Sequence, residues 1–130
     1  MEYWHKVLQT KYNIVDKFNH NYVVDSAPKN FLTTLEIGCG DGEHLKYEKL
    51  TEIQKKNYFA LDVRENMLKK LKEKYPEVNS SIGDCQQKLK HEDDFFDRII
   101  AIHVLEHLPN LPETVMEMYR LCKKKREFFR

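Results

Sequence analysis

The most chemically distinctive segment of this 130-residue chain is Glu36-Ile37-Gly38-Cys39-Gly40-Asp41-Gly42, in which three glycines alternate with other residues. The apolar residues just before it predict a buried strand, and the glycines predict a turn that leads into a helix. Glycine tolerates positive φ and lets backbone N–H groups approach a bound polar or anionic group closely. A hairpin turn needs only one or two glycines. The segment therefore predicts a ligand-binding turn, with a purely structural strand-to-helix connection as the alternative.

Polar residues also follow the other strands that the sequence predicts. Asp62 ends a second apolar segment, about 20 residues after the glycine turn. In nucleotide-binding folds an acid at this position accepts hydrogen bonds from a ribose diol, although aspartate also caps helices well. Gly83-Asp84-Cys85 follows a third strand, and residues 103–107 follow a fourth. Because the carboxyl ends of parallel strands share one edge of a sheet, these groups are expected to surround one site.

Hydrophobic periodicity predicts that strands alternate with helices along the chain. Such alternation favours a doubly wound α/β fold with a mostly parallel sheet, right-handed crossovers and flanking helices. The apolar run at residues 99–102 is predicted to be buried on both faces, as in a central strand. The predicted strands cover residues 31–37, 58–62, 78–82 and 96–103, and the predicted helices cover residues 2–18, 43–51, 64–75 and 112–123.

The first helix is amphipathic and is predicted to end before residues 19–22. Packing on the domain is the preferred interpretation, and an aromatic lid over the ligand is the alternative. The chain is expected to form one domain, with an N-terminal helical segment at residues 1–26 and an α/β core at residues 31–130. The residues of the lid would be Tyr3, Trp4, Tyr12 and Tyr22.

Composition and charge exclude several classes of protein. Lysine and arginine total 22 against 21 acidic residues, and the net charge of +1 gives no reason to expect binding to nucleic acid or to an anionic membrane. No segment has the apolar length of a signal-peptide core or a membrane helix, so the cytoplasm is the expected location. The three cysteines form no CxxC pair, and neither a disulfide framework nor a zinc knuckle is predicted.

The spacing of the glycines separates two kinds of nucleotide site. A dinucleotide fingerprint, G-x-G-x-x-G, would need a third glycine at position 43, where the chain has Glu43. The pattern is E-x-G-x-G-x-G, which resembles motif I of class I S-adenosylmethionine-dependent methyltransferases. Three more segments resemble later motifs of this family in the same order, so that the resemblance covers residues 31–121. These segments are residues 59–63 with Met67 and Leu68, residues 83–85, and residues 96–97 with residues 103–108.

The resemblance implies a Rossmann-like fold that binds S-adenosylmethionine and releases S-adenosylhomocysteine. The implied reaction is methyl transfer to an acceptor that is expected to be a small molecule. The implied cofactor-binding residues are Glu36 near the amino group, Gly38, Cys39 and Gly40 along the methionine part, Asp62 at the ribose, Val63 on the adenine face, Met67 on the following helix, Asp84 at the adenine amino group, Cys85 beside the ring, and His103 where cofactor and acceptor meet.

Methyl transfer is an in-line displacement, so the protein mainly positions the reactants, and a base is needed only when the acceptor must lose a proton. The candidates for that base are His103, Glu106 and His107. These residues also match H-x-x-E-H, a zinc peptidase signature that requires a helix. Because a strand is predicted immediately before them, a zinc hydrolase is a remote alternative, and no metal site is expected.

The resemblance ends after the predicted helix at residues 112–123, whereas the family has seven strands. The fold is therefore expected to be incomplete at its C-terminus, with residues 127–130 as a shortened fifth strand. The fourth strand would then have an open apolar edge, which a homodimer or another chain would cover, or which would leave the domain marginally stable. A non-catalytic cofactor-binding remnant or a partner-binding module is the alternative function. The basic run at residues 123–126 is expected to complement a helix end.

Overall fold

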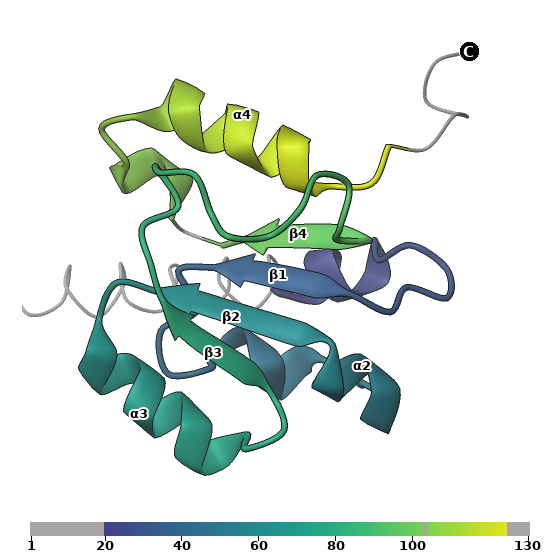
Figure 1. Ribbon diagram of the computed structural model, residues 1–130. Coiled ribbons are helices and arrows are strands. Elements are labelled where there is room, and N and C mark those ends of the chain that lie inside the picture. The colour runs from purple at the N-terminus through teal and green to yellow at the C-terminus, as the bar shows by residue number, and fades with distance from the viewer. Residues whose placement is uncertain (1–19, 103, 125–130) are drawn as a thin grey trace, which may run out of the picture.

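The computed structural model describes residues 20–102 and 104–124, which contain a four-stranded sheet. The strands pair in the order β3-β2-β1-β4, and every pair is parallel. The chain moves outward from β1 in one direction and then returns to its other side, so the switch point lies between β1 and β4. The predicted doubly wound fold is confirmed, with strands shorter than the predicted segments (Figure 1). The strands are β1 (Thr34–Ile37), β2 (Tyr58–Asp62), β3 (Asn79–Ile82) and β4 (Arg98–Ala101).

Helices lie on both faces of the sheet. The predicted helices at residues 64–75 and 112–123 are confirmed as α3 and α4, which Figure 1 shows on opposite sides of the sheet. Among the described residues, no helix has the length and apolar character needed to cross a membrane. The helices are α2 (Glu52–Lys56), α3 (Glu65–Lys74) and α4 (Leu111–Leu121), with the 3-10 helices η1 (His44–Tyr47) and η2 (Leu105–His107).

The predicted helix at residues 43–51 is wrong. This segment forms only the short η1, and α2 begins after it. Thr51 starts α2 through a capping box, because its hydroxyl oxygen accepts a hydrogen bond from the Gln54 N–H while Gln54 accepts one from the Thr51 N–H. Thr51 therefore begins a helix where apolar spacing alone predicts an end.

The segment before β1 is helical at residues 20–25, so the prediction that residues 20–22 break a helix is wrong. Tertiary contacts explain the difference, because His20 is buried, stacks on Tyr47 and lies 2.8 Å from His44 between the two Nδ1 atoms. These contacts outweigh the modest helix propensity of asparagine and histidine. Tyr22 is exposed. The remainder of the predicted first helix, with Tyr3, Trp4 and Tyr12, lies outside the described residues.

The sheet separates two apolar clusters, one on each face. Leu35 and Ile37 of β1 pack with Leu121 of α4. Tyr58 of β2 packs on the other face with Leu71 of α3. Side chains of a strand alternate between faces, so β1 and β2 are held from both sides. The loops at their carboxyl ends therefore start from rigid positions.

β4 is the terminal strand of the described sheet, and it is less buried than predicted. Ile99 and Ala101 are only half-buried, so the prediction that residues 99–102 are buried on both faces is wrong. The reason is that, in the described sheet, β4 pairs with β1 on one side only. On its other side, the chain after α4 pairs with the residues just before β4 and not with β4 itself. There the Lys123 N–H donates to the Phe96 carbonyl at 2.8 Å.

The start of the basic run caps α4. The Lys124 ammonium donates to the carbonyls of Tyr119 and Arg120 and forms an ion pair with Asp94 at 2.9 Å. A lysine at this position satisfies carbonyl groups that a helix leaves without partners at its C-terminus. The predicted helix-end role is confirmed for Lys124, and residues 125–130 lie outside the described residues.

Candidate functional site

A cavity of about 400 Å³ opens at the carboxyl ends of the strands. Its volume lies within the range of about 300–1,000 Å³ that is typical of small-molecule sites. Residues that follow β1, β2 and β3 meet there, although they are far apart in the sequence. The predicted binding residues that line it are Gly38, Asp62, Val63, Asp84 and Cys85, and the other lining residues are Ile37, Leu61, Arg64, Gly83, Gln86, Ile102, Val104, His107 and Leu108.

The three glycines of the turn have positive φ, at +67° for Gly38, +58° for Gly40 and +96° for Gly42. The turn is fixed to β2, because the N–H groups of residues 38 and 39 donate to the Leu61 carbonyl at 2.8 and 3.1 Å. A Cβ atom on Gly38 would lie 2.4 Å from Cγ2 of Val104. Both conformation and space therefore require glycine at position 38, where the backbone borders the cavity.

Asp62 ends β2, and four hydrogen bonds surround its buried carboxylate. Oδ2 accepts from the Gly40 N–H at 2.8 Å, and Oδ1 accepts from the Arg64 N–H at 2.9 Å. The Arg64 guanidinium donates to both oxygens, at 3.0 and 3.1 Å. Burial disfavours the charge, but the hydrogen bonds outweigh it and hold the pKa of Asp62 below its usual value. Asp62 therefore stays ionised, ties the glycine turn to β2 and supports the start of α3.

Asp84 and Val63 add a carboxylate and an apolar surface to the lining of the cavity. Asp84 Oδ1 accepts from the backbone N–H and the side-chain amide of Gln86, at 2.9 and 3.1 Å, whereas no described residue donates to Oδ2. Val63 is 63% exposed although it is apolar. An apolar surface beside an available carboxylate oxygen suits an aromatic base that carries an amino group. Burial raises the pKa of the neighbouring Cys85 thiol, so this thiol is protonated at neutral pH.

Glu36 is buried within the sheet and does not itself line the cavity. Its Oε1 accepts a hydrogen bond of 2.6 Å from the Tyr58 hydroxyl. Burial raises the pKa of Glu36 to about 7, although the Tyr58 hydrogen bond opposes the shift. Burial also raises the pKa of the Cys39 thiol, which is therefore protonated at neutral pH. The predicted binding residues that do not line the cavity are Glu36, Cys39, Gly40 and Met67, and their contacts with a ligand stay predictions.

The predicted candidates for a base follow β4. Glu106 and His107 belong to η2, and His103 lies outside the described residues. His107 lines the cavity, and its Nε2 lies 3.7 Å from Oε1 of Glu106. Across residues 20–102 and 104–124, no three histidine, cysteine or acidic side chains gather as a metal site. Of the three candidates, the structure brings His107 to the cavity.

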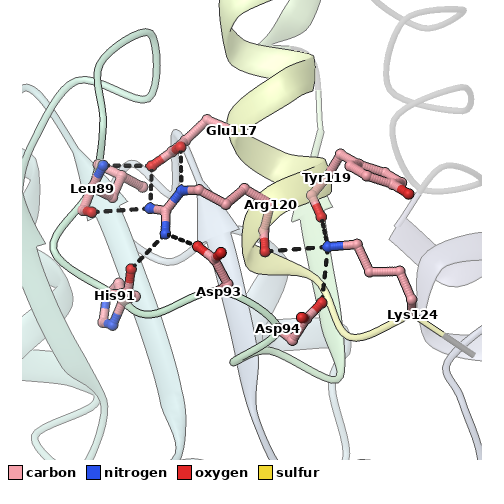
Figure 2. A network of polar contacts seen from close by, with 8 residues as sticks. All are labelled: Leu89, His91, Asp93, Asp94, Glu117, Tyr119, Arg120 and Lys124. Atoms are coloured by element: carbon pink, nitrogen blue, oxygen red, sulfur yellow. Dashed lines mark hydrogen bonds and ion pairs between the residues drawn. The ribbon is translucent and has the colours of Figure 1, made fainter.

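Sequence reasoning missed a polar network that holds residues 89–93 against α4 (Figure 2). The Arg120 guanidinium donates to the carbonyls of Leu89 and His91 at 3.1 and 2.9 Å. It also forms ion pairs with Glu117 at 2.6 Å and Asp93 at 2.8 Å. An acid three residues before an arginine on one helix predicts a pair, but not that the pair binds a loop. The network fixes the connection that leads from the cavity to β4.

Arg120→Ala is expected to loosen this connection. The Leu89 N–H, which donates to Glu117, is expected to exchange with solvent about tenfold faster, because the loop loses its arginine contacts. Amide hydrogen exchange measures this rate. Arg120→Lys keeps the charge but not the planar fork, so its rate is expected to be intermediate. Equal rates in the three proteins would contradict the role of Arg120.

A second polar cluster is buried on the sheet face that carries Tyr58. The Arg98 side chain donates to the Thr34 hydroxyl at 2.7 Å and to the carboxylate of Glu48, next to His44. The Arg98 contacts join residues that are 64 and 50 positions apart in the chain. No local pattern could have brought these residues together. None of them lines the cavity.

Residues 35–129 match the family described as methyltransferase domain. A human protein named arginine-hydroxylase NDUFAF5, mitochondrial, is 28% identical over 100 residues. This match covers 77% of the chain and 28% of the human protein. The chain therefore spans about a quarter to a third of the length of this curated relative.

Solved structures share the fold. A Methanococcus maripaludis protein described as a candidate S-adenosyl-L-methionine-dependent methyltransferase has a TM-score of 0.68 at 16% identity, over 95% of this chain and 57% of its own. The [4+2]-cyclase SpnF has a TM-score of 0.69 at 18% identity, over 83% and 41%. A complex of the Haloferax volcanii Trm112 methyltransferase activator and a candidate methyltransferase gives 0.66 at 18%, over 80% and 47%. At these identities the likeness shows the fold, and the chain spans less than two thirds of each relative.

Proposed function

The chain belongs to the methyltransferase domain family, and we propose that it binds S-adenosylmethionine in the cavity at the carboxyl edge of the sheet and transfers its methyl group to a small-molecule acceptor. The observation that carries this proposal is the meeting of Gly38, Asp62 and Asp84 around one cavity. Three strand ends supply these residues, and each offers the chemistry that one part of the cofactor needs. Gly38 has no side chain and lines the cavity, which supports the close approach of a ligand to the backbone.

Each part of the cofactor has a proposed partner. The glycine turn binds the methionine part through its backbone, and Asp62 accepts from the ribose hydroxyls. Val63 covers the adenine face, and the available Oδ2 of Asp84 accepts from the adenine amino group. Cys85 contributes its backbone beside the ring. S-adenosylmethionine supplies an activated methyl group when it is bound.

The fold alone does not identify the reaction. The human relative is named a hydroxylase and one structural relative a cyclase, so likeness alone does not assign methyl transfer. The family description favours methyl transfer. When the acceptor loses a proton, His107 is the proposed base, because its imidazole lines the cavity and can accept a proton through a ring nitrogen.

Calorimetric titration of the chain with S-adenosylmethionine and S-adenosylhomocysteine tests the proposal. Saturable binding of both is expected, with no binding of NAD or zinc ions as controls. Absence of binding by a protein that circular dichroism shows to be folded would contradict it. Mass spectrometry of candidate acceptors for the gain of a methyl group then tests turnover separately from binding.

Asp84→Asn is expected to weaken S-adenosylhomocysteine binding about tenfold. Asparagine keeps an oxygen for the two Gln86 hydrogen bonds but puts an NH₂ group where the adenine amino group needs an acceptor. Glu92→Gln is the matched control, because Glu92 is an exposed acid in the same connection and does not line the cavity. Calorimetry of the three proteins measures the difference. Equal affinities would remove Asp84 from the adenine site.

A further inference from the structure

The Asp62 carboxylate, which a ribose would have to reach, is saturated by the chain itself. Oδ1 accepts from the backbone N–H and Nε of Arg64, and Oδ2 accepts from the Gly40 N–H and from Nη2 of Arg64. A carboxylate has about four lone-pair directions for hydrogen bonds. In this arrangement a further donor finds no free direction.

The four hydrogen bonds differ in how easily they can be exchanged. The two backbone donors belong to the glycine turn and to the start of α3, and neither can leave without a change of fold. The other donors belong to the Arg64 guanidinium. The Arg64 side chain is 53% exposed, whereas that of Asp62 is 2% exposed. Water can therefore solvate the guanidinium when it leaves, so this half of the interaction can be exchanged at low cost.

The guanidinium occupies the place that the proposed function gives to the ribose. Arg64 lines the cavity together with Asp62 and Val63. Its Nη2 would lie 3.6 Å from a Cβ built on Gly40, so the guanidinium lies beside the glycine turn. A guanidinium and a ribose diol each present two donors to one carboxylate. Exchange of one for the other replaces two hydrogen bonds with two and leaves the backbone unchanged.

We propose that Arg64 competes with the ribose for Asp62, so that the ligand binds only after the guanidinium has swung away from the carboxylate. This inference rests on the proposed function. Arg64 then sets the affinity of the site for every ligand that carries a free ribose diol, and it keeps the buried Asp62 charge paired while the ribose is absent.

Arg64→Ala tests the competition. The substitution preserves the start of α3, because Arg64 makes no side-chain capping bond there and the Asp62 bond to its backbone N–H remains. Lys70→Ala is the matched control, because Lys70 is exposed on the same helix and its removal changes the net charge equally. Calorimetry with S-adenosylhomocysteine is expected to show about three- to fivefold tighter binding by Arg64→Ala and unchanged binding by Lys70→Ala.

A second ligand assigns the effect to the diol. An analogue of S-adenosylhomocysteine without the 2′ and 3′ hydroxyls is expected to gain nothing from Arg64→Ala. An equal gain for the analogue, or equal or weaker binding of S-adenosylhomocysteine by Arg64→Ala, would overturn the competition while the unaltered chain still binds. Failure of all three proteins to bind would instead overturn the proposed function, and the competition with it.

Discussion

Glu36→Gln is expected to be more stable than the unaltered chain above pH 7. Burial raises the pKa of Glu36 from its ordinary value of 4.5 to about 7. Between these values the folded protein holds a proton that the unfolded chain has released, so the free energy of unfolding falls as the pH rises. The loss is absent below pH 4.5, complete above pH 7, and corresponds to roughly 3 kcal/mol. Glutamine keeps an oxygen for the Tyr58 hydroxyl and carries no charge at any pH.

Urea denaturation at a series of pH values measures the difference between the two proteins. Glu48→Gln is the control, because it lies in the same region of the structure and is expected to change the stability in the opposite direction. Burial disfavours the Glu48 charge, but His44 and Arg98 outweigh it and hold the pKa of Glu48 below its usual value. Removal of this charge is therefore expected to lower stability at neutral pH. If the free energy of unfolding fell equally with rising pH in Glu36→Gln and in the unaltered chain, the account of Glu36 would be disproved.

Glu36 also shows where sequence reasoning reaches its limit. An acid before a glycine turn suggests a ligand contact, but its partner in the structure is Tyr58, which follows 22 positions later. The register of β1 and β2 pairs Thr34 with Tyr58 and Glu36 with Ala60, which puts Glu36 and Tyr58 on one face. Strand register depends on packing over the whole sheet, and the sequence of one strand does not contain it.

The order of strands and helices could be predicted because it follows from local patterns. Apolar runs of strand length alternate with helical spacing, and parallel strands place their carboxyl ends at one edge. The same rule predicts that Asp62 and Asp84 lie near the glycine turn, and both line the cavity with Gly38. The start of α2 could also have been predicted from the sequence, since Thr51 and Gln54 have the spacing of a capping box, which a search for apolar spacing overlooks.

The roles of Arg64 and Arg120 could not be predicted from the sequence. Charged residues on helix surfaces are commonly solvated, and although an acid lies two residues before Arg64 and three before Arg120, nothing local shows that the first pair lines a cavity or that the second holds a loop. Each acquires its role from the path of a loop: Arg64 from the turn after β2, and Arg120 from the connection that carries Leu89. The partners of Arg120 at Leu89 and His91 lie 31 and 29 positions away in the chain, so they can be named only once the fold is known.

Gly38→Ala is expected to destabilise the domain by about 2–4 kcal/mol. One part of the loss is conformational, because φ of +67° is unfavourable for alanine. The other part is steric, because the new Cβ would lie 2.4 Å from Cγ2 and 3.2 Å from Cγ1 of Val104. Gly40→Ala is the matched control for conformation. Its φ is +58°, but the nearest atom, Nη2 of Arg64, is 3.6 Å away, so a loss of only about 1 kcal/mol is expected in urea denaturation.

Val104→Ala separates the two costs at Gly38. Without the γ carbons the nearest atom of residue 104 is its Cβ, at 3.3 Å, so most of the steric part is removed, and Gly38→Ala is expected to cost only about 1 kcal/mol in a Val104→Ala background. Additive effects in this double-mutant cycle would contradict the steric account.

The double variant also tests whether a ligand approaches the backbone of residue 38. It relieves the clash with residue 104 but keeps the new alanine side chain at the edge of the cavity. If the cofactor lies against the Gly38 backbone, the double variant is expected to fold but not to bind S-adenosylhomocysteine. Binding by the double variant would mean that packing against Val104, and not the approach of a ligand, explains the glycine at this position.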